Sequence, residues 1–227
     1  EALGAKYKGK HTGSFGIIGT YSTFYSHHIC TMEGGVAVTN DDDLYHLMLS
    51  IRAHGWTRDI PSESKIYTKS EDEFYESFNF IIPGYNLRPL EMEAAIGIHQ
   101  LDKLETFIEN RRSNANFLRI KISNPNILLQ TEIGKSSWFG FSLVLMNDLR
   151  GTRDSVVQTL KRAGIEARPI VAGNFTKNSV IEYFDYSISG TLTNADIIHE
   201  NGMFVGNHSV KIEENIGSLA RLLNSLE

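Results

Sequence analysis

The chain has 227 residues, of which 41% are hydrophobic and 22% charged, and its formal net charge is −5. That composition is ordinary for a soluble globular protein, and the negative charge argues against a general nucleic-acid-binding surface. Cys30 is the single cysteine, which excludes an internal disulfide and Cys-x-x-Cys metal sites and favours a reducing, cytoplasmic compartment. No stretch reads as a secretory segment or as an apolar run long enough to cross a membrane, so we expect no membrane partner.

Two short strands are expected early in the chain, at residues 20–25 (TYSTFY) and 34–40 (GGVAVTN). The residues before them read as loop with short strand pieces. Asn40-Asp41-Asp42-Asp43 then supplies N-cap chemistry for a helix that ends near Gly55. The apolar residues of this helix recur at helical spacing, at Leu44, Leu47, Met48 and Ile51.

Residues 56–85 carry charges, aromatics and two prolines and predict a long irregular segment. Such a segment in a compact domain is usually functional or covered by a partner. Pro89 suits the first turn of a helix, and apolar periodicity continues to residue 122. Because this is longer than most globular helices, we expect it to bend or break.

The remaining residues alternate strands and helices. Strands are expected at residues 126–130, 136–146, 165–171 and 203–208, and helices at residues 153–164, 194–202 and 213–226. This alternation predicts a small α/β or α+β domain. Asn124-Pro125-Asn126 is the best boundary, so we expect one domain over residues 1–123 and a second over residues 124–227.

One group of residues near the amino terminus has the spacing of a known functional motif. Ser22 precedes His27 by five residues, and Glu33-Gly34-Gly35 and a Val-Ala-Val-Thr-Asn strand end follow. Together with the segments AHGWTRDIP (53–61), PGYNLRPLEMEAAIGIHQLDKL (83–104) and ARPIVAGNFTKN (167–178), this resembles the DegT/DnrJ/EryC1/StrS family of pyridoxal-phosphate-dependent nucleotide-sugar enzymes. The segments occur in family order and cover nearly the whole chain.

The resemblance implies an α/β fold of the aspartate aminotransferase type, fold type I. Residues 1–123 would be the later part of the large cofactor-binding domain with its linking helix, and residues 124–227 the small carboxy-terminal domain. The family's aspartate that faces the pyridine nitrogen precedes the segment found here at residues 2–5. We therefore expect the chain to be a carboxy-terminal fragment of a longer protein, or a truncated relative.

His27 stands where aminotransferases of this family have the lysine that bonds to the cofactor, and no lysine lies between His11 and Ser64. Only a primary amine condenses with the cofactor's aldehyde, so imidazole removes the covalent anchor but can still carry a proton. The resemblance is strongest to the 3-dehydratases of nucleotide-linked 4-keto-6-deoxy sugars, which also carry paired histidines. It implies pyridoxal 5′-phosphate or pyridoxamine 5′-phosphate as cofactor, an amine donor such as glutamate, and loss of the C3 hydroxyl with His27 as base. Such an enzyme would act in surface polysaccharide biosynthesis.

The resemblance assigns further roles one residue at a time. Ser22 matches the serine whose hydroxyl binds the cofactor phosphate. Asn86 matches the asparagine that reaches the phosphate in the neighbouring subunit, which implies a homodimer with shared active sites. Arg88, Arg168 and Asn174 are expected to bind the nucleotide-sugar substrate, and an arginine fork suits its phosphates.

Other interpretations stay open. A sugar aminotransferase that uses histidine instead of lysine would need the same cofactor, and a non-catalytic, truncated sugar-binding remnant would explain the absent aspartate. A metal site is not expected, because adjacent histidines on a strand, here His27 and His28, point to opposite faces. His28 is expected to be structural, and Cys30 to be a small buried residue.

Overall fold

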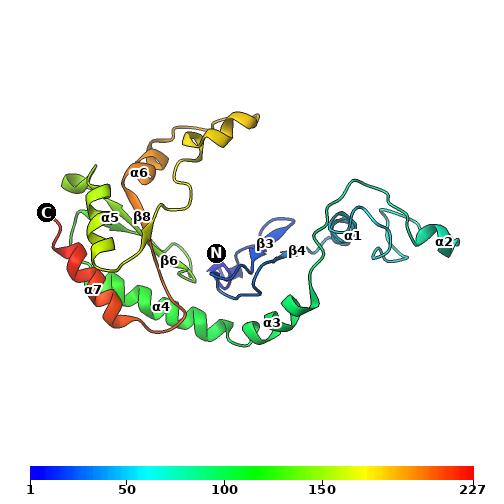
Figure 1. Cartoon of the computed structure of the whole chain (residues 1–227), viewed down its shortest axis with the longest axis horizontal. Coiled ribbons are helices and arrows are strands. Elements are labelled where there is room, and N and C mark those ends of the chain that lie inside the picture. The colour runs from blue at the N-terminus through cyan, green and yellow to red at the C-terminus, as the bar shows by residue number, and fades with distance from the viewer. The chain divides into compact units, whose positions relative to one another are not determined.

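The computed structural model describes residues 1–227, which divide into two compact units, Glu1–Leu104 and Glu105–Glu227. Figure 1 shows the course of the chain through both units. The division falls at the start of helix α4 (Leu104–Lys121), whereas the sequence suggests a boundary after residue 123. The reason is that Ala115 and Leu118 of α4 belong to the hydrophobic core of the second unit.

The first unit begins with two antiparallel hairpins. The first joins β1 (Lys6–Tyr7) to β2 (Lys10–His11), and the second joins β3 (Gly19–Ser22) to β4 (Gly35–Val38). In the second hairpin Gly19 pairs with Val38 and Ser22 with Gly35. The strand predicted at residues 20–25 therefore ends at Ser22, because the chain leaves the ladder there to form the loop that carries His27.

Helix α1 (Asp42–Ile51) follows β4 as predicted. The Asp41 carboxylate caps it by accepting a hydrogen bond from the Leu44 amide at 3.0 Å. The chain then turns at Gly55, where φ is +86° and a Cβ would collide with the carbonyl oxygen of Ile82. A glycine is needed at this position because the returning segment packs directly against it.

The irregular segment at residues 56–85 is organised around one carboxylate, that of Glu76 at the end of helix α2 (Glu73–Glu76). Its Oε1 accepts hydrogen bonds from the Tyr67 hydroxyl at 2.7 Å and from the Ser70 amide at 2.8 Å, and its Oε2 accepts one from the Thr57 hydroxyl at 3.0 Å. Trp56 is buried beside this network, and its indole N–H donates to the Ser77 carbonyl at 3.0 Å. A segment without regular structure is thus held by side chains.

We expect the stability of this segment to fall both in acid and in strong base. The Tyr67 hydroxyl, followed by the Ser70 amide, lowers the pKa of Glu76, and the same bond raises the pKa of Tyr67. The Glu76 contribution to stability is present above the pKa of the unfolded chain and is lost as pH falls through the lower folded value. The Tyr67 contribution is present below the tyrosine pKa of the unfolded chain and is lost as pH rises through the higher folded value. The segment should hold between about pH 5 and pH 10 and loosen in acid.

The indole N–H resonance of Trp56 in an NMR titration reports this change. It should shift with acid in the parent protein, and the transition should be absent in Glu76→Gln, which cannot titrate. A Trp56 resonance that titrates identically in the parent and in Glu76→Gln would contradict the role given to Glu76.

The predicted long helix is broken, as expected. Helix α3 (Glu91–Leu101) ends before Asp102 and Lys103, and α4 begins at Leu104. Pro89 precedes α3 instead of opening it, and the Glu93 carboxylate accepts a hydrogen bond from the Leu90 amide at 3.1 Å to fix the helix start.

The second unit is built on one antiparallel sheet in the order β5 (Ile127–Leu129), β6 (Gly140–Leu145), β8 (Gly202–Gly206) and β7 (Ala167–Arg168). Helices α5 (Arg153–Arg162), α6 (Thr193–Asn201) and α7 (Glu213–Asn224) alternate with the strands, and short 3₁₀ turns occur at η1 (Asn147–Leu149), η2 (Phe175–Lys177) and η3 (Ser179–Tyr183). The core joins α4, α5 and α7 to β6 and β8 through side chains such as Leu118, Leu160, Leu223, Leu143 and Met203. This is the α+β option of the two predicted for this part of the chain.

The two predicted strands that differ most from the structure lie in the second unit. The strand predicted at residues 136–146 starts at Gly140, because Glu132 accepts hydrogen bonds from the Ser136 amide at 2.7 Å and from the Trp138 indole at 3.3 Å and holds those residues outside the sheet. The strand predicted at residues 165–171 keeps only two residues. No helix of the chain combines the length and the apolar character that a bilayer crossing requires.

Candidate active site

Ser22 and His27 lie on one loop of the first unit, between the end of β3 and the start of β4. Ser22 is the last residue of β3, and its hydroxyl oxygen accepts a hydrogen bond from the Phe24 amide at 3.3 Å. A tight turn follows, in which the His27 amide donates to the Phe24 carbonyl at 2.9 Å. The five residues from Ser22 to His27 thus comprise the end of β3 and the turn that follows it.

A pair of threonines closes the base of this loop. The Thr31 hydroxyl lies 2.6 Å from the Thr23 hydroxyl and 2.6 Å from the Glu33 carbonyl, and the Thr31 amide donates to the Thr23 carbonyl at 2.8 Å. Gly34 has φ of +105°, and a Cβ there would lie 3.3 Å from the Thr23 hydroxyl oxygen. The first glycine of the Glu-Gly-Gly motif therefore allows the two strands to meet beneath the loop.

His27 is partly enclosed in this loop. Its side chain is 17% exposed, its ring packs edge-on against Phe24 with centroids 5.9 Å apart, and its Nε2 lies 4.0 Å from Glu1 Oε1. His28 is buried, which agrees with the structural role expected of it. The two neighbouring histidines thus have different environments, and the less buried one occupies the lysine position of the motif.

These residues suit a phosphate-bearing cofactor that is held without a covalent bond. The Ser22 oxygen already accepts a bond, so its own proton is the one available to donate to a phosphate oxygen. No lysine lies between Lys10 and Lys65, and imidazole cannot replace an amine in a bond to an aldehyde. The donor set therefore fits pyridoxal or pyridoxamine phosphate with His27 as a proton carrier.

Asn86 and Arg88 lie on a separate segment of the same unit, fixed along the end of α1. Asn86 forms a β-bridge with Ala53, and the Leu87 amide donates to the Arg52 carbonyl at 2.8 Å. The side chains of Asn86 and Arg88 are exposed. This segment thus combines a fixed backbone with exposed side chains.

Arg168 and Asn174 belong to the second unit. Arg168 is exposed on strand β7, with its guanidinium carbon 4.7 Å from the centre of the Phe204 ring. Asn174 is only 4% exposed, and its side chain bonds to groups within the unit. Both residues were expected to bind substrate directly. The exposed Arg168 is accessible to a substrate, whereas the side chain of Asn174 is buried.

Several residues that build these loops were missed by pattern reasoning. Thr23 and Thr31 hold the His27 loop, and Asp196 on α6 binds Asn174. Isolated threonines and a helical aspartate occur in any globular chain, so they carry no signal until the fold brings them to their partners.

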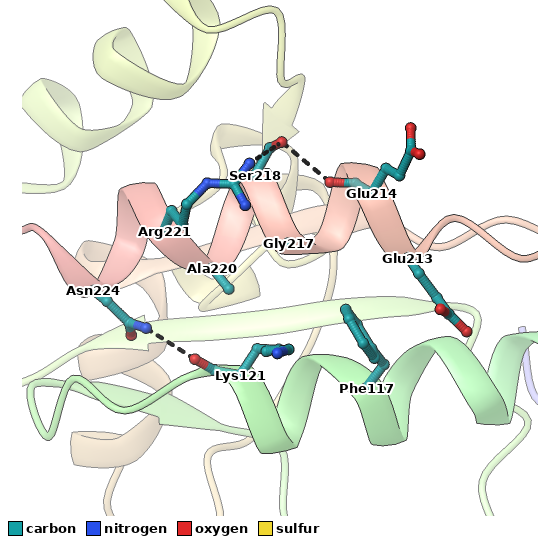
Figure 2. Close-up of a pocket in the computed structure, with 9 residues that line it drawn as sticks. All are labelled: Phe117, Lys121, Glu213, Glu214, Gly217, Ser218, Ala220, Arg221 and Asn224. Atoms are coloured by element: carbon teal, nitrogen blue, oxygen red, sulfur yellow. Dashed lines mark hydrogen bonds between the residues drawn. The ribbon is translucent and has the colours of Figure 1, made fainter.

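A groove of the second unit lies elsewhere, between α4 and α7. Asn224 Nδ2 donates to the Lys121 carbonyl at 2.8 Å at one end of it, and Phe117 faces Gly217 and Ala220 across it (Figure 2). Its volume is about 630 Å³, and Glu213, Glu214, Lys121 and Arg221 give it a mixed charge. None of the predicted site residues lines it, so we do not assign the reaction to this groove.

The fold is that of part of the fold-type-I class of pyridoxal-phosphate-dependent enzymes, as the similar solved structures show. The model of the DegT/DnrJ/EryC1/StrS aminotransferase family matches residues 1–219, and the chain belongs to that family. The family and the fold class expected from the motifs are thereby confirmed.

Close relatives share both sequence and structure with the chain. It is 53% identical over 226 residues to the GDP-4-keto-6-deoxy-D-mannose 3-dehydratase of Yersinia pseudotuberculosis, covering 98% of this chain and 58% of the relative. The solved GDP-4-keto-6-deoxy-D-mannose-3-dehydratase of E. coli with bound hydrated PLP is 51% identical with a TM-score of 0.93, covering 97% of this chain and 57% of that one. A structure of GDP-4-keto-6-deoxymannose-3-dehydratase with a trapped PLP–glutamate geminal diamine is 50% identical with the same TM-score, covering 97% and 58%. The chain therefore spans a little over half the length of these relatives.

Proposed function

We propose that the protein catalyses the pyridoxal-phosphate-dependent loss of the C3 hydroxyl from a nucleotide-linked 4-keto-6-deoxy sugar, with GDP-4-keto-6-deoxymannose as the first substrate to test. The observation that carries the proposal is His27 at the lysine position of the family motif, in a chain about half identical to 3-dehydratases. A transaminase of this family would be expected to keep the lysine amine there.

When bound, the cofactor supplies an amine for the 4-keto group and a ring that accepts electrons. His27 accepts a proton on an imidazole nitrogen and returns it later, which is the role of a general acid–base group. The contact with Phe24 restricts rotation of the His27 ring. The hydrogen bond between Thr23 and Thr31 holds the base of the loop that carries His27. Because imidazole forms no covalent bond to the cofactor, binding depends on hydrogen bonds such as the one from the Ser22 hydroxyl.

The assembly and the substrate contacts are part of the same proposal. Asn86 would donate its amide to the cofactor phosphate of a second subunit, so the working unit is a homodimer with shared active sites. Its exposed side chain on a fixed backbone supports this. Arg88 and Arg168, both exposed, would bind the phosphates of the nucleotide sugar.

Glutamate is the proposed amine donor, supported by the relative solved with a PLP–glutamate adduct. The reaction would feed surface polysaccharide synthesis and take place in the cytoplasm. The basis for this compartment is the single cysteine of the sequence. Cys30 itself was expected to be buried but is only partly buried.

Mass analysis of the product tests the proposal. The protein is incubated with pyridoxal phosphate, glutamate and GDP-4-keto-6-deoxymannose, and the sugar product is measured by mass spectrometry. Loss of the C3 oxygen with no nitrogen retained is the expected result. A product that keeps the oxygen and gains an amine would identify a histidine-dependent aminotransferase. Absence of product and of any cofactor absorbance change, in folded protein, would identify a non-catalytic remnant.

A further inference from the structure

Asn174 is embedded in its own unit instead of being presented to solvent. Its Nδ2 donates to Asp196 Oδ1 at 2.8 Å, and its Oδ1 accepts hydrogen bonds from the Thr176 amide at 3.1 Å and the Thr176 hydroxyl at 2.8 Å. An asparagine side chain has two donor hydrogens and two acceptor positions, so three of the four are filled. Little capacity remains for a direct bond to substrate.

The same Asp196 oxygen holds a second group of this segment. Lys177 Nζ lies 2.9 Å from Asp196 Oδ1 and 3.0 Å from Glu200 Oε1. The bonds from Asn174 and then from Lys177 lower the pKa of Asp196, and the bonds to Asp196 and Glu200 raise the pKa of Lys177. Both groups are therefore charged, and favourably paired, at neutral pH.

A third contact binds the backbone of the segment at Asn174. The Asn174 amide donates to His199 Nδ1 at 3.3 Å, and Gly173 has φ of +60° with so little space that a Cβ would lie 2.6 Å from the same nitrogen. Asp196, His199 and Glu200 are spaced i, i+3 and i+4 and so share one face of α6. This face, which we call the α6 clamp, holds residues 173–177 through side chains and backbone together.

The residues just before the clamped stretch are exposed and partly strained. Val171 is 76% exposed and has φ of +49°, a conformation that a β-branched residue adopts only when its surroundings enforce it. Arg168 is exposed on β7, which pairs only with β8 and so forms an edge of the sheet. The clamp thus fixes one end of residues 168–173, and the edge strand fixes the other.

We propose that Asp196 is a positioning residue for the reaction: through Asn174 and Lys177 it holds residues 168–173 in the conformation that presents Arg168 to the nucleotide-sugar phosphates. This inference rests on the proposed function and changes the role of Asn174 from substrate ligand to internal support. Asp196 acts through the segment and makes no contact with substrate. Its removal should therefore weaken substrate binding more than the chemical step.

The test compares Asp196→Ala with Asp196→Asn and with Asp185→Ala. Asp196→Asn keeps an oxygen that can accept from Asn174 and loses only the charge, and Asp185 is an exposed aspartate outside the α6 clamp. Two measurements are made: hydrogen exchange at the amides of Asn174 and Thr176, and the kcat and KM for GDP-4-keto-6-deoxymannose. A displacement of about 1 Å in a positioned group can cost up to about 100-fold in catalytic efficiency.

In Asp196→Ala we expect hydrogen exchange at both amides to be at least about tenfold faster. We expect KM to rise about tenfold or more and kcat to change much less. Asp196→Asn should recover part of both effects, and Asp185→Ala should match the parent. Faster exchange with an unchanged KM would overturn the positioning role, and unchanged exchange would overturn the clamp. If the parent protein converts no nucleotide-linked 4-keto sugar, the proposed function fails and the positioning role fails with it, while the exchange data still decide whether the clamp exists.

Discussion

Replacing His27 by Asn is expected to lower turnover of the nucleotide sugar by about 10²- to 10⁴-fold, the usual contribution of a positioned acid–base group. Asparagine is close in shape and polar, but it cannot accept and return a proton near neutral pH. Affinity for pyridoxamine phosphate should change little, because in the proposed site His27 forms no covalent bond to the cofactor and the Ser22 hydroxyl donates to its phosphate. Turnover is measured by product formation, and affinity by absorbance titration with the cofactor.

His11→Asn is the matched control, because His11 is an exposed histidine on β2 of the same unit. It should leave both turnover and cofactor affinity unchanged. Substantial turnover in His27→Asn would show that another group moves the proton. A large loss of cofactor affinity in the same variant would show that His27 serves mainly to hold the cofactor.

Replacing Asn114 by Ala is expected to destabilise the second unit by about 3 kcal/mol, because it leaves several buried polar groups without partners. Asn114 is fully buried, and its Nδ2 lies within 3.0 Å of Asn207 Oδ1 and 2.8 Å of the Val210 carbonyl. Its Oδ1 accepts from the Ile212 amide at 3.2 Å. One side chain on α4 thus ties down the connection from β8 to α7.

Hydrogen exchange at the most protected amides of β6 and β8 measures this change, since their opening reports the stability of the unit. A loss of about 3 kcal/mol corresponds to exchange about 100-fold faster. Asn116→Ala on the same helix is the control, because Asn116 is exposed, and it should change stability by less than about 0.5 kcal/mol. Equal exchange rates in the two variants would contradict the importance given to this buried amide.

The parts of the fold that the sequence predicts well are those set by local periodicity. Helix α1, with Asp41 at its N-cap, and helices α5, α6 and α7 lie close to their expected residues, and the long helix breaks as expected. The strand at residues 136–146 is overestimated because its first residues are held by Glu132, whose contact with Trp138 forms only in the folded chain. Local patterns carry no information on such contacts.

The candidate site shows the same division. The positions of Ser22 and His27 on one loop follow from their spacing and the family motif. The threonine pair beneath the loop and the burial of Asn174 do not, because they depend on which groups the fold brings within hydrogen-bonding distance. Asn174 resembles a substrate ligand in sequence, yet its surroundings favour an internal role.

Borohydride reduction followed by intact-mass and peptide analysis tests the central claim most directly. The reagent converts a covalent bond between a lysine amine and pyridoxal phosphate into a permanent one, so it reports whether any lysine in the protein anchors the cofactor. The protein reconstituted with pyridoxal phosphate should release all of it on denaturation after reduction and retain its unmodified mass. A stable phosphopyridoxyl adduct on one lysine, formed in proportion to activity, would contradict a site in which His27 has replaced the anchoring amine.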